Sequence, residues 1–427
     1  MPPRLTALRY LTRFQCTTSD CPDNCCFGMK VMLTADDRAR LESTSGPGPD
    51  AWRARLENAV EPASDLAEGY VAVLRTGGGG GCRMLDADRL CAVHRGHGEA
   101  ALPTVCAQFP RVSSRFEGRR ELAATLSCPE AARLCLTAPD ALDVVDAPGL
   151  FPASPEPDRS TPSTPYSAPA DEVHAAVGEV LRDARLPVAL RVALVGELGR
   201  RTGSTFRADA AEVDREALTR ELHAFRAPET ISAVAEQLRA GAWPATQALQ
   251  AVMGLFASLP EGAPTRAHLV PFAMNQYLSE AKAAYPALGT EGGPPLWAVL
   301  WERVQVRRQF LHAHLGGALE AYYARYLIND WHREWYTQSP SLSAHAFKLA
   351  VRLAGVMLLV MGHPALYRSP APGQPEVDAV VVDAAQVYAR HVERNPDVLA
   401  ALEDLLRPEV LGTDDFGRVA TFARLAV

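Results

Sequence analysis

The sequence predicts a mainly helical protein in two parts, an N-terminal cysteine-rich metal-binding module with little strand and a large all-helical region after it. Three observations lead to this prediction. Eight of the nine cysteines precede residue 129, apolar residues recur at helical spacing from residue 171 onward, and a proline-rich stretch separates the two parts. We place the module at 1–138, a linker at 139–170 and the helical domain at 171–427.

The clustered cysteines predict a metal site, because thiolates offered from short loops can converge on one ion or cluster. Disulfides would suit a secreted chain, but Met-Pro-Pro-Arg-Leu-Thr starts no signal peptide. Scattered core cysteines would not cluster, and a lone catalytic thiol would leave seven unexplained. The adjacent pair Cys25-Cys26 implies either two metals or one spectator. The predicted ligands are Cys16, Cys21, Cys25, Cys26, Cys82, Cys91, Cys106 and Cys128.

The type of metal stays open between zinc and iron, because both accept thiolate ligands. No Cys-x2-Cys pair occurs in the chain, which disfavours a zinc ribbon. The Cys-x3-Cys-x2-Cys spacing of radical enzymes that use S-adenosylmethionine is absent too. We expect an iron–sulfur cluster, with 4Fe–4S favoured and zinc as the alternative.

Local signals give the expected elements of the module. Thr34-Ala-Asp-Asp predicts a capped helix start. The run Gly77–Gly81 lacks a following Lys-Ser/Thr, so it predicts a flexible turn and no phosphate loop. Between Cys82 and Cys91 we expect a loop or hairpin.

The end of the module predicts a short strand over 119–127 that leads into Cys128. A helix follows, with Pro129 at its first position, where the missing N–H costs nothing. Cys135 lies two turns along this helix and is expected to be a plain buried thiol. Between Pro139 and Pro169 eight prolines are mixed with Ser, Thr, Asp and Glu, which predicts a surface linker.

The rest of the chain follows helical periodicity. We expect helices near 171–181, 190–198, 211–225, 228–242, 245–258, 265–284, 295–336, 344–361 and 382–394. No series of βαβ units with a glycine-rich turn is visible, so the common sheet architecture of methyltransferases is not expected.

Four cysteine phrases carry a family resemblance. Residues 14–28, 81–94, 102–111 and 126–134 resemble, in this order, the bacterial flagellin lysine-N-methylases, which belong to a wider group of cysteine-cluster proteins expected to chelate zinc or iron. Two distal segments, 320–329 and 387–395, are also similar. The resemblance implies a protein lysine N-methyltransferase that uses S-adenosylmethionine and acts on a protein with surface lysines, flagellin-like or another polypeptide.

The candidate residues outside the cysteines lie mostly in the aromatic segment 295–336. Tyr322, Tyr326 and Asn329 share a helix face by steps of four and three, and such a face could accept a sulfonium or a lysine side chain. Core packing or a satisfied interior network is the alternative. The candidates are Tyr322, Tyr326 and Asp330 for catalysis, and Arg111, Glu320, Asn329 and Arg390 for cofactor binding. Arg390 and Glu393 are spaced to pair on a helix surface.

Net charge and hydrophobicity limit the kinds of partner that the chain can bind. The net charge of −7 argues against a nucleic-acid partner. The longest uncharged apolar run, Ala354–Met361, is far shorter than the roughly 20 residues of a membrane span, so we expect no membrane segment and a cytoplasmic location. Two other functions remain open, a radical or redox iron–sulfur enzyme that acts on a peptide and a non-catalytic metal-binding or metal-delivery protein.

Overall fold

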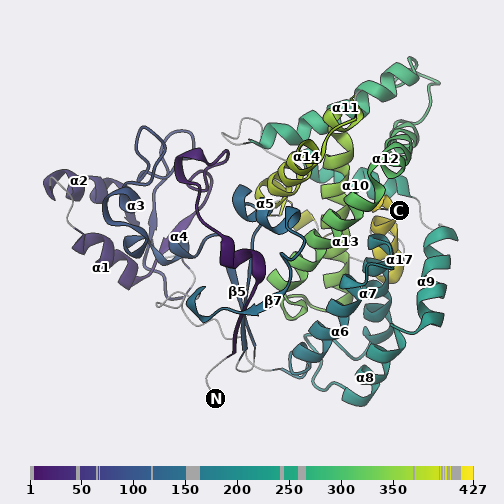
Figure 1. Ribbon diagram of the computed structural model, residues 1–427, viewed down its shortest axis with the longest axis horizontal. Helices are drawn as coiled ribbons and strands as arrows, with labels where there is room; N and C mark the ends of the chain where they lie inside the picture. The colour runs from purple at the N-terminus through teal and green to yellow at the C-terminus, as the bar shows by residue number, and fades with distance from the viewer. Residues whose placement is uncertain are drawn as a thin grey trace.

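The structure is a computed structural model, and it describes residues 4–426 apart from 45–48, 64–65, 67, 117–118, 151–163, 241–244, 258–265, 369–370, 394, 396–397, 399, 402–403 and 405–414. A small cysteine-rich part lies at one end and a large helical part at the other, with a four-stranded sheet between them (Figure 1). The predicted class, a mainly helical protein with little strand near the N-terminus, is confirmed.

The small part, residues 14–108, is called the cysteine lobe below. Its antiparallel sheet has the order β2 (Val31–Leu33), β4 (Ala72–Leu74) and β3 (Val60–Pro62). Its helices are α1 (Ala35–Ser43), α2 (Pro49–Ala59), α3 (Ala92–His97) and α4 (Thr104–Gln108). The predicted cap of α1 is confirmed, because Asp37 N donates to Thr34 Oγ1 and Thr34 N donates to the Asp37 carboxylate, each at 3.1 Å.

The sheet between the two parts was not expected. Its order is β5 (Arg111–Phe116), β6 (Arg119–Ala124), β1 (Arg4–Leu8) and β7 (Val144–Asp146). β1 runs parallel to β6, with Leu5 opposite Arg120, and antiparallel to β7. β6 confirms the predicted strand before Cys128, and α5 (Pro129–Thr137) confirms the helix after it. β7 lies within the stretch predicted as linker, whose residues 151–163 are outside the described residues.

The expected helices are present in the helical part, and α17, which was not predicted, follows them. They are α6 (Ala170–Arg182), α7 (Val188–Thr202), α8 (Arg215–Ala224), α9 (Pro228–Ala240), α10 (Ala245–Ala257), α11 (Leu269–Ala284), α12 (Leu296–Arg333), α13 (Leu342–Gly362), α14 (Gln374–Val387) and α17 (Asp415–Ala423). A π-helical turn, Tyr388–Val392, continues α14. Inserted turns of this kind are frequent at functional sites.

Helix α13 forms the centre of the helical part and packs against α7, α12 and α17. Its 21 residues have a mean hydropathy of 1.6 over their most apolar window, which by length and composition is enough to cross a membrane. However, 94% of that window is buried inside the protein. Gly355 of α13 lies directly against the Tyr388 ring, where a Cβ atom would come within 2.2 Å of it. We therefore describe α13 as a core helix.

Two hydrophobic cores divide the described residues. The smaller one lies in the cysteine lobe, between residues 31 and 102. The larger one joins the helices to β1, β6 and α5. The division at 138 and 170 stays a prediction, but the structure shows that β1, β6 and α5 share their core with the helices.

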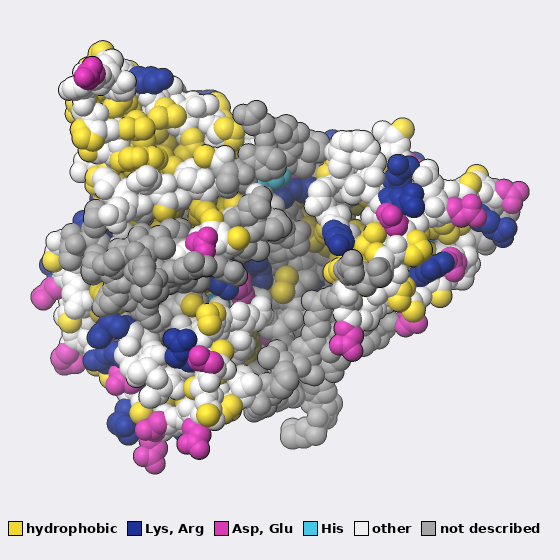
Figure 2. All heavy atoms as spheres, turned by 180° about the vertical axis from the view of Figure 1, so that it is seen from behind, with side chains coloured by type: hydrophobic (Ala, Val, Ile, Leu, Met, Phe, Trp, Pro, Cys, Tyr) yellow, Lys and Arg dark blue, Asp and Glu magenta, His cyan; other side chains and the backbone are white. Residues whose placement is uncertain are grey.

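Large hydrophobic side chains are exposed near the outer end of the helical part. Figure 2 shows them gathered on the upper left of the view from behind, over α11 and the first half of α12. They include Phe272, Leu296, Val306 and Phe310, each about 40–50% exposed.

Candidate metal centre and active site

The loop that carries Cys21, Cys25 and Cys26 is shaped by the side chain of Asn24. Its Oδ1 accepts the Cys26 N–H at 2.9 Å, and its Nδ2 donates to the Arg89 carbonyl at 2.7 Å. Asn and Asp side chains favour such local turns because they replace a backbone partner. The contact with Arg89 ties the loop to the segment between Cys82 and Cys91.

A hairpin-like segment brings Cys82 and Cys91 to the same place. Cys82 N donates to the Cys26 carbonyl at 2.8 Å, and an isolated bridge pairs Leu85 with Cys91. Another bridge pairs Phe27 with Gly81, where a Cβ atom would come within 2.9 Å of the Phe27 ring. The predicted loop or hairpin is therefore confirmed, and the site needs Gly81 for close approach of the two segments.

The eight predicted ligands form two overlapping groups of neighbours. Burial and then the nearby thiols of Cys91, Cys82 and Cys25 raise the pKa of Cys106. Burial, followed by Cys21 and Cys25, raises the pKa of Cys128 to about 12. Cys25 belongs to both groups. Cys16, which is exposed, enters the site as a neighbour of Cys21.

Backbone N–H groups point at several of these sulfur atoms. Met84 N donates to Cys82 Sγ at 3.5 Å. Amides two or three residues further along the chain also approach the sulfurs of Cys21, Cys91 and Cys128, and each contact works against the rise in the pKa of that thiol. Hydrogen bonds of this kind stabilise the thiolate, which is the form that binds metal. The donor set therefore fits an iron–sulfur cluster or zinc.

The helical part holds the cysteine loop through Arg390. Its guanidinium donates to the carbonyls of Asp23, Asn24 and Phe27 at 3.2, 2.9 and 2.8 Å, and it forms an ion pair with the Asp23 carboxylate at 3.3 Å. Gln386, one turn earlier, donates to the same carboxylate at 2.8 Å. Arg390, predicted to bind a cofactor, lies against the backbone of the loop that carries Cys25 and Cys26. The proposed pair with Glu393 does not form.

Glu393 instead joins Tyr326 and Asp330 to a buried network of charges. Tyr326 donates to Glu393 at 2.6 Å, and Arg333 bridges Glu393 and Asp330. Arg352 of α13 donates to the second oxygen of Asp330 at 2.9 Å. Burial, with the carboxylates close by, raises the pKa of Tyr326 well above its usual value. Tyr326 is therefore a neutral hydrogen-bond donor near neutral pH.

Tyr322 lies one turn before Tyr326 and faces α14. Its hydroxyl donates to the Asp378 carboxylate, and Gln374 lies beside both. Burial and then the carboxylate raise the pKa of Tyr322. Asp378 is half-buried and Gln374 exposed, so this pair lies nearer to solvent than Tyr326.

The other predicted cofactor residues are separate from these pairs. Asn329 accepts from Tyr10 at 2.8 Å and donates to the Ala124 carbonyl at 3.0 Å. Glu320 accepts the Val188 N–H at 2.9 Å, which caps the start of α7. Arg111 lies over the Phe14 ring, 5.4 Å from its centre. Burial and then the nearby Cys135 thiol raise the pKa of Tyr10, the partner of Asn329, well above its usual value.

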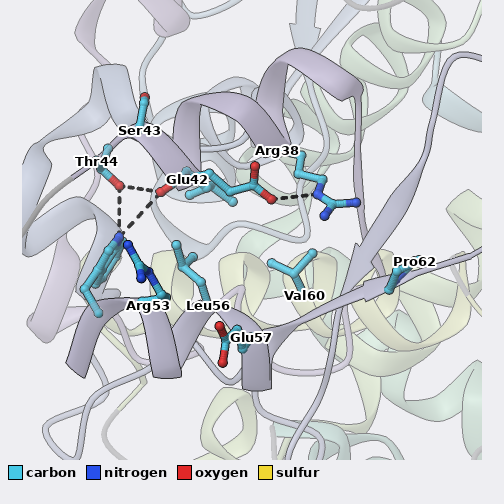
Figure 3. A pocket seen from close by; sticks show the side chains of 11 residues that line it. Arg38, Glu42, Ser43, Thr44, Arg53, Leu56, Glu57, Val60 and Pro62 are labelled. Carbon is cyan, nitrogen blue, oxygen red and sulfur yellow. Dashed lines mark hydrogen bonds and ion pairs between the residues drawn. The ribbon is translucent and has the colours of Figure 1, made fainter. Parts of the chain in front are cut away.

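A cavity in the cysteine lobe lies apart from the predicted residues. Its volume is about 560 Å³, and α1 and α2 line it (Figure 3). Trp52, whose indole donates to Thr44 at 3.1 Å, is among the lining residues. Figure 3 shows the ion pair of Arg38 with Glu42 across from Leu56. No cysteine lines this cavity among the described residues.

Sequence reasoning missed one further cluster, Glu121, His174 and His332, on β6, α6 and α12. Burial opposes ionisation of Glu121, but hydrogen bonds from both histidines hold its pKa below the usual range. Burial lowers the pKa of His174 to about 4 and also lowers that of His332. The three residues are far apart in the sequence, and no local pattern marks them.

Comparison with known proteins agrees with the family resemblance over part of the chain. A lysine-N-methylase of Salmonella typhimurium is 28% identical over 138 residues, which cover 32% of this chain and 34% of that protein. A lysine-N-methylase of Salmonella choleraesuis matches to the same extent. The flagellar biosynthetic protein FliU of Salmonella muenchen is 28% identical over 138 residues, 80% of its own length.

The predicted resemblance is therefore confirmed as a distant one over about a third of the chain. The match also spans about a third of the length of the two lysine-N-methylases. No family model matches the chain, and no solved structure matches it.

Proposed function

We propose that this protein transfers methyl groups from S-adenosylmethionine to lysine side chains of a protein substrate. The observation that carries the proposal is the similarity to lysine-N-methylases over 138 residues. The geometry supports it, because the helical turn that grips the cysteine loop through Arg390 also carries Glu393, the partner of Tyr326.

The cysteines are the proposed ligands of an iron–sulfur cluster, with zinc as the alternative. The donors would be Cys16, Cys21, Cys25, Cys26, Cys82, Cys91, Cys106 and Cys128. When bound, a cluster with an open iron would anchor the amino acid moiety of S-adenosylmethionine, whereas fully ligated zinc would only hold the loops together. In either case Arg390 and Gln386 hold the loop of Cys21 to Cys26 in place.

The target lysine is proposed to enter beside Tyr322 and Asp378, since Asp378 is half-buried and Gln374 beside it is exposed. Methyl transfer needs a neutral amine, so the ammonium first gives up a proton, and we propose the Asp378 carboxylate as its acceptor. The amine nitrogen then bonds to the methyl carbon as the carbon–sulfur bond breaks, and the sulfonium becomes a thioether. The product is an N-methylammonium, and Asp378 returns the proton it accepted to solvent water.

Tyr322 is proposed to orient the amine and does not act as its base. Its pKa is raised, so the phenol stays protonated near neutral pH. Tyr326 and Asp330 are buried, Tyr326 donating to Glu393 and Asp330 pairing with Arg333, and their proposed role is to hold the Tyr322 face of α12 in position.

The test is transfer of methyl label from S-adenosylmethionine to protein, using chain purified without oxygen. Flagellin and a mixture of lysine-containing proteins serve as substrates, and labelled lysine is identified after hydrolysis. We expect label on lysine with the wild type, and at least tenfold slower transfer with Asp378→Asn and Tyr322→Phe. Tyr285→Phe is the matched control, since Tyr285 also donates to a carboxylate, that of Glu302, which lies near the start of α12 and far from Tyr322.

Binding of S-adenosylmethionine without label on any protein would contradict methyl transfer. Equal rates for wild type, Asp378→Asn and Tyr322→Phe, with label present, would contradict the proposed place of the lysine and leave the activity standing.

A further inference from the structure

Glu121, His174 and His332 meet in the interior with three possible ligand atoms facing one another. His174 Nε2 lies 3.3 Å from His332 Nδ1 and 3.6 Å from Glu121 Oε1. His332 Nδ1 also contacts Glu121 Oε1. All three side chains are buried, and their ligand atoms lie within 4.8 Å of one another. Two nitrogen atoms bound to one tetrahedral zinc ion lie about 3.3 Å apart, given bonds of about 2.0 Å.

The three side chains are held in place by their surroundings. The His174 ring stacks between Trp331 and Trp335, with ring centres 5.3 and 4.3 Å away and nearly parallel planes. The second oxygen of Glu121 accepts from Arg119 at 2.7 Å, which orients the carboxylate. Partners of this kind fix the direction of metal ligands.

A cavity of about 510 Å³ opens onto the two histidines. Arg9, Arg119, Arg182 and Asp143 line it together with His174 and His332. An ion held by three protein ligands keeps coordination positions for a further ligand, and this cavity leaves room for one. The arginines favour an anionic group there.

We propose that Glu121, His174 and His332 bind one divalent transition-metal ion, at a site separate from the cysteines. Two imidazoles and one carboxylate suit zinc or iron(II), and three protein ligands with an open side are typical of catalytic rather than structural sites. The site does not depend on methyl transfer, and its donors come from three elements that the cysteine lobe does not share.

The guanidinium of Arg182 opposes metal binding at His332. Its Nη2 lies 2.5 Å from His332 Nε2, and a guanidinium has only donors, so Nε2 is the acceptor and the proton of His332 lies on Nδ1, facing Glu121. A metal ion at Nδ1 displaces this proton, and Arg182 must turn away as Nε2 becomes protonated. Arg182 therefore competes with the ion, and its removal should strengthen binding.

The test is the amount of zinc bound by the full chain after its cysteine site has been filled and weakly held metal removed. Zinc is then added, and bound metal is measured after ultrafiltration. We expect the wild type to bind one more zinc per chain than His174→Gln or Glu121→Gln. Arg182→Met should bind this zinc at least tenfold more tightly than the wild type.

His345→Gln is the matched control, because His345 is equally buried and contacts Trp331 but lies outside the three ligands. It should bind zinc as the wild type does. Circular dichroism and the metal content of the cysteine site show whether a variant is folded. Equal zinc stoichiometry and affinity in the wild type, His174→Gln and Arg182→Met would overturn the proposal.

Discussion

The cysteine lobe and the helical part bury apolar side chains on very different scales. In the helical part, α13 is surrounded by α7, α12 and α17, and nearly all of its side chains are buried. In the cysteine lobe the strands are three residues long, and the core is formed by a few side chains such as Leu33, Leu41 and Met84. Small cores of this kind usually need a staple, such as a metal.

This difference in apolar burial indicates where each part gets its stability. The helical part should fold on its apolar packing alone. The cysteine lobe should depend on the proposed metal and on the contacts that Arg390 makes from the helical side.

Removal of the metal, or Cys91→Ser, should unfold the cysteine lobe and leave the helical part folded. Losing a ligand present at a thousand times its dissociation constant costs about 4 kcal/mol, so amide protection in β2 and β4 should fall by about three orders of magnitude. Hydrogen exchange read by mass spectrometry measures both parts at once. Cys135→Ser is the control, and it should keep the lobe protected, because Cys135 lies in the larger core. Uniform loss of protection in α13 would contradict the division.

Leu353→Ala in α13 should destabilise the helical part and leave the cysteine lobe unchanged. Its side chain is fully buried, and deleting such a group costs about 2–5 kcal/mol. The helical part should unfold at lower denaturant concentration, while the metal content of the folded protein stays at the wild-type value. Denaturant titration followed by far-ultraviolet circular dichroism measures the first effect, and metal analysis measures the second. Leu296→Ala, at an exposed position on α12, should change stability little.

Acid should weaken the helical part through His345. Burial, opposed by Glu334 and Asp330 and aided by Lys348 and Arg352, lowers its pKa to about 4. The unfolded chain takes up this proton near pH 6.5 and the folded chain near pH 4, so stability is lost as the pH falls between these values. Between pH 7 and pH 5 His345 should lower the free energy of unfolding by about 2 kcal/mol.

His345→Asn should lose about 2 kcal/mol less than the wild type over this pH range, as measured by urea unfolding at each pH. An identical pH dependence in the two proteins would show that His345 is not buried in neutral form.

The helices were predictable from sequence because their signal is local. Apolar residues four apart, as in Leu190, Leu194 and Leu198, mark α7 without reference to any other segment. The sheet that contains β1 was not predictable in this way, because Leu5 pairs with Arg120 and no short window contains both. The predicted metal ligands were identifiable as a cluster of cysteines, and the structure places several of these thiols near one another.

The partners of the site residues could not be read from the sequence for the same reason. Arg390 grips carbonyls of residues more than 360 positions earlier, and backbone carbonyls leave no trace in a side-chain pattern. His174 lies on the buried face of α6, where its neighbours Val173 and Val177 mark only a core position. Its proximity to Glu121 and His332 depends on three elements meeting.

The helical part holds the cysteine loop through the guanidinium of Arg390. The metal that Arg390→Met retains after a fixed challenge with a chelator tests this directly. Removal of the guanidinium leaves three backbone carbonyls and the buried Asp23 carboxylate short of a partner, which typically costs about 3–5 kcal/mol. We expect Arg390→Met to lose metal at least tenfold faster than the wild type. Arg185→Met, which breaks an exposed ion pair, should lose metal at the wild-type rate. Equal retention in Arg390→Met and the wild type would contradict this role of Arg390.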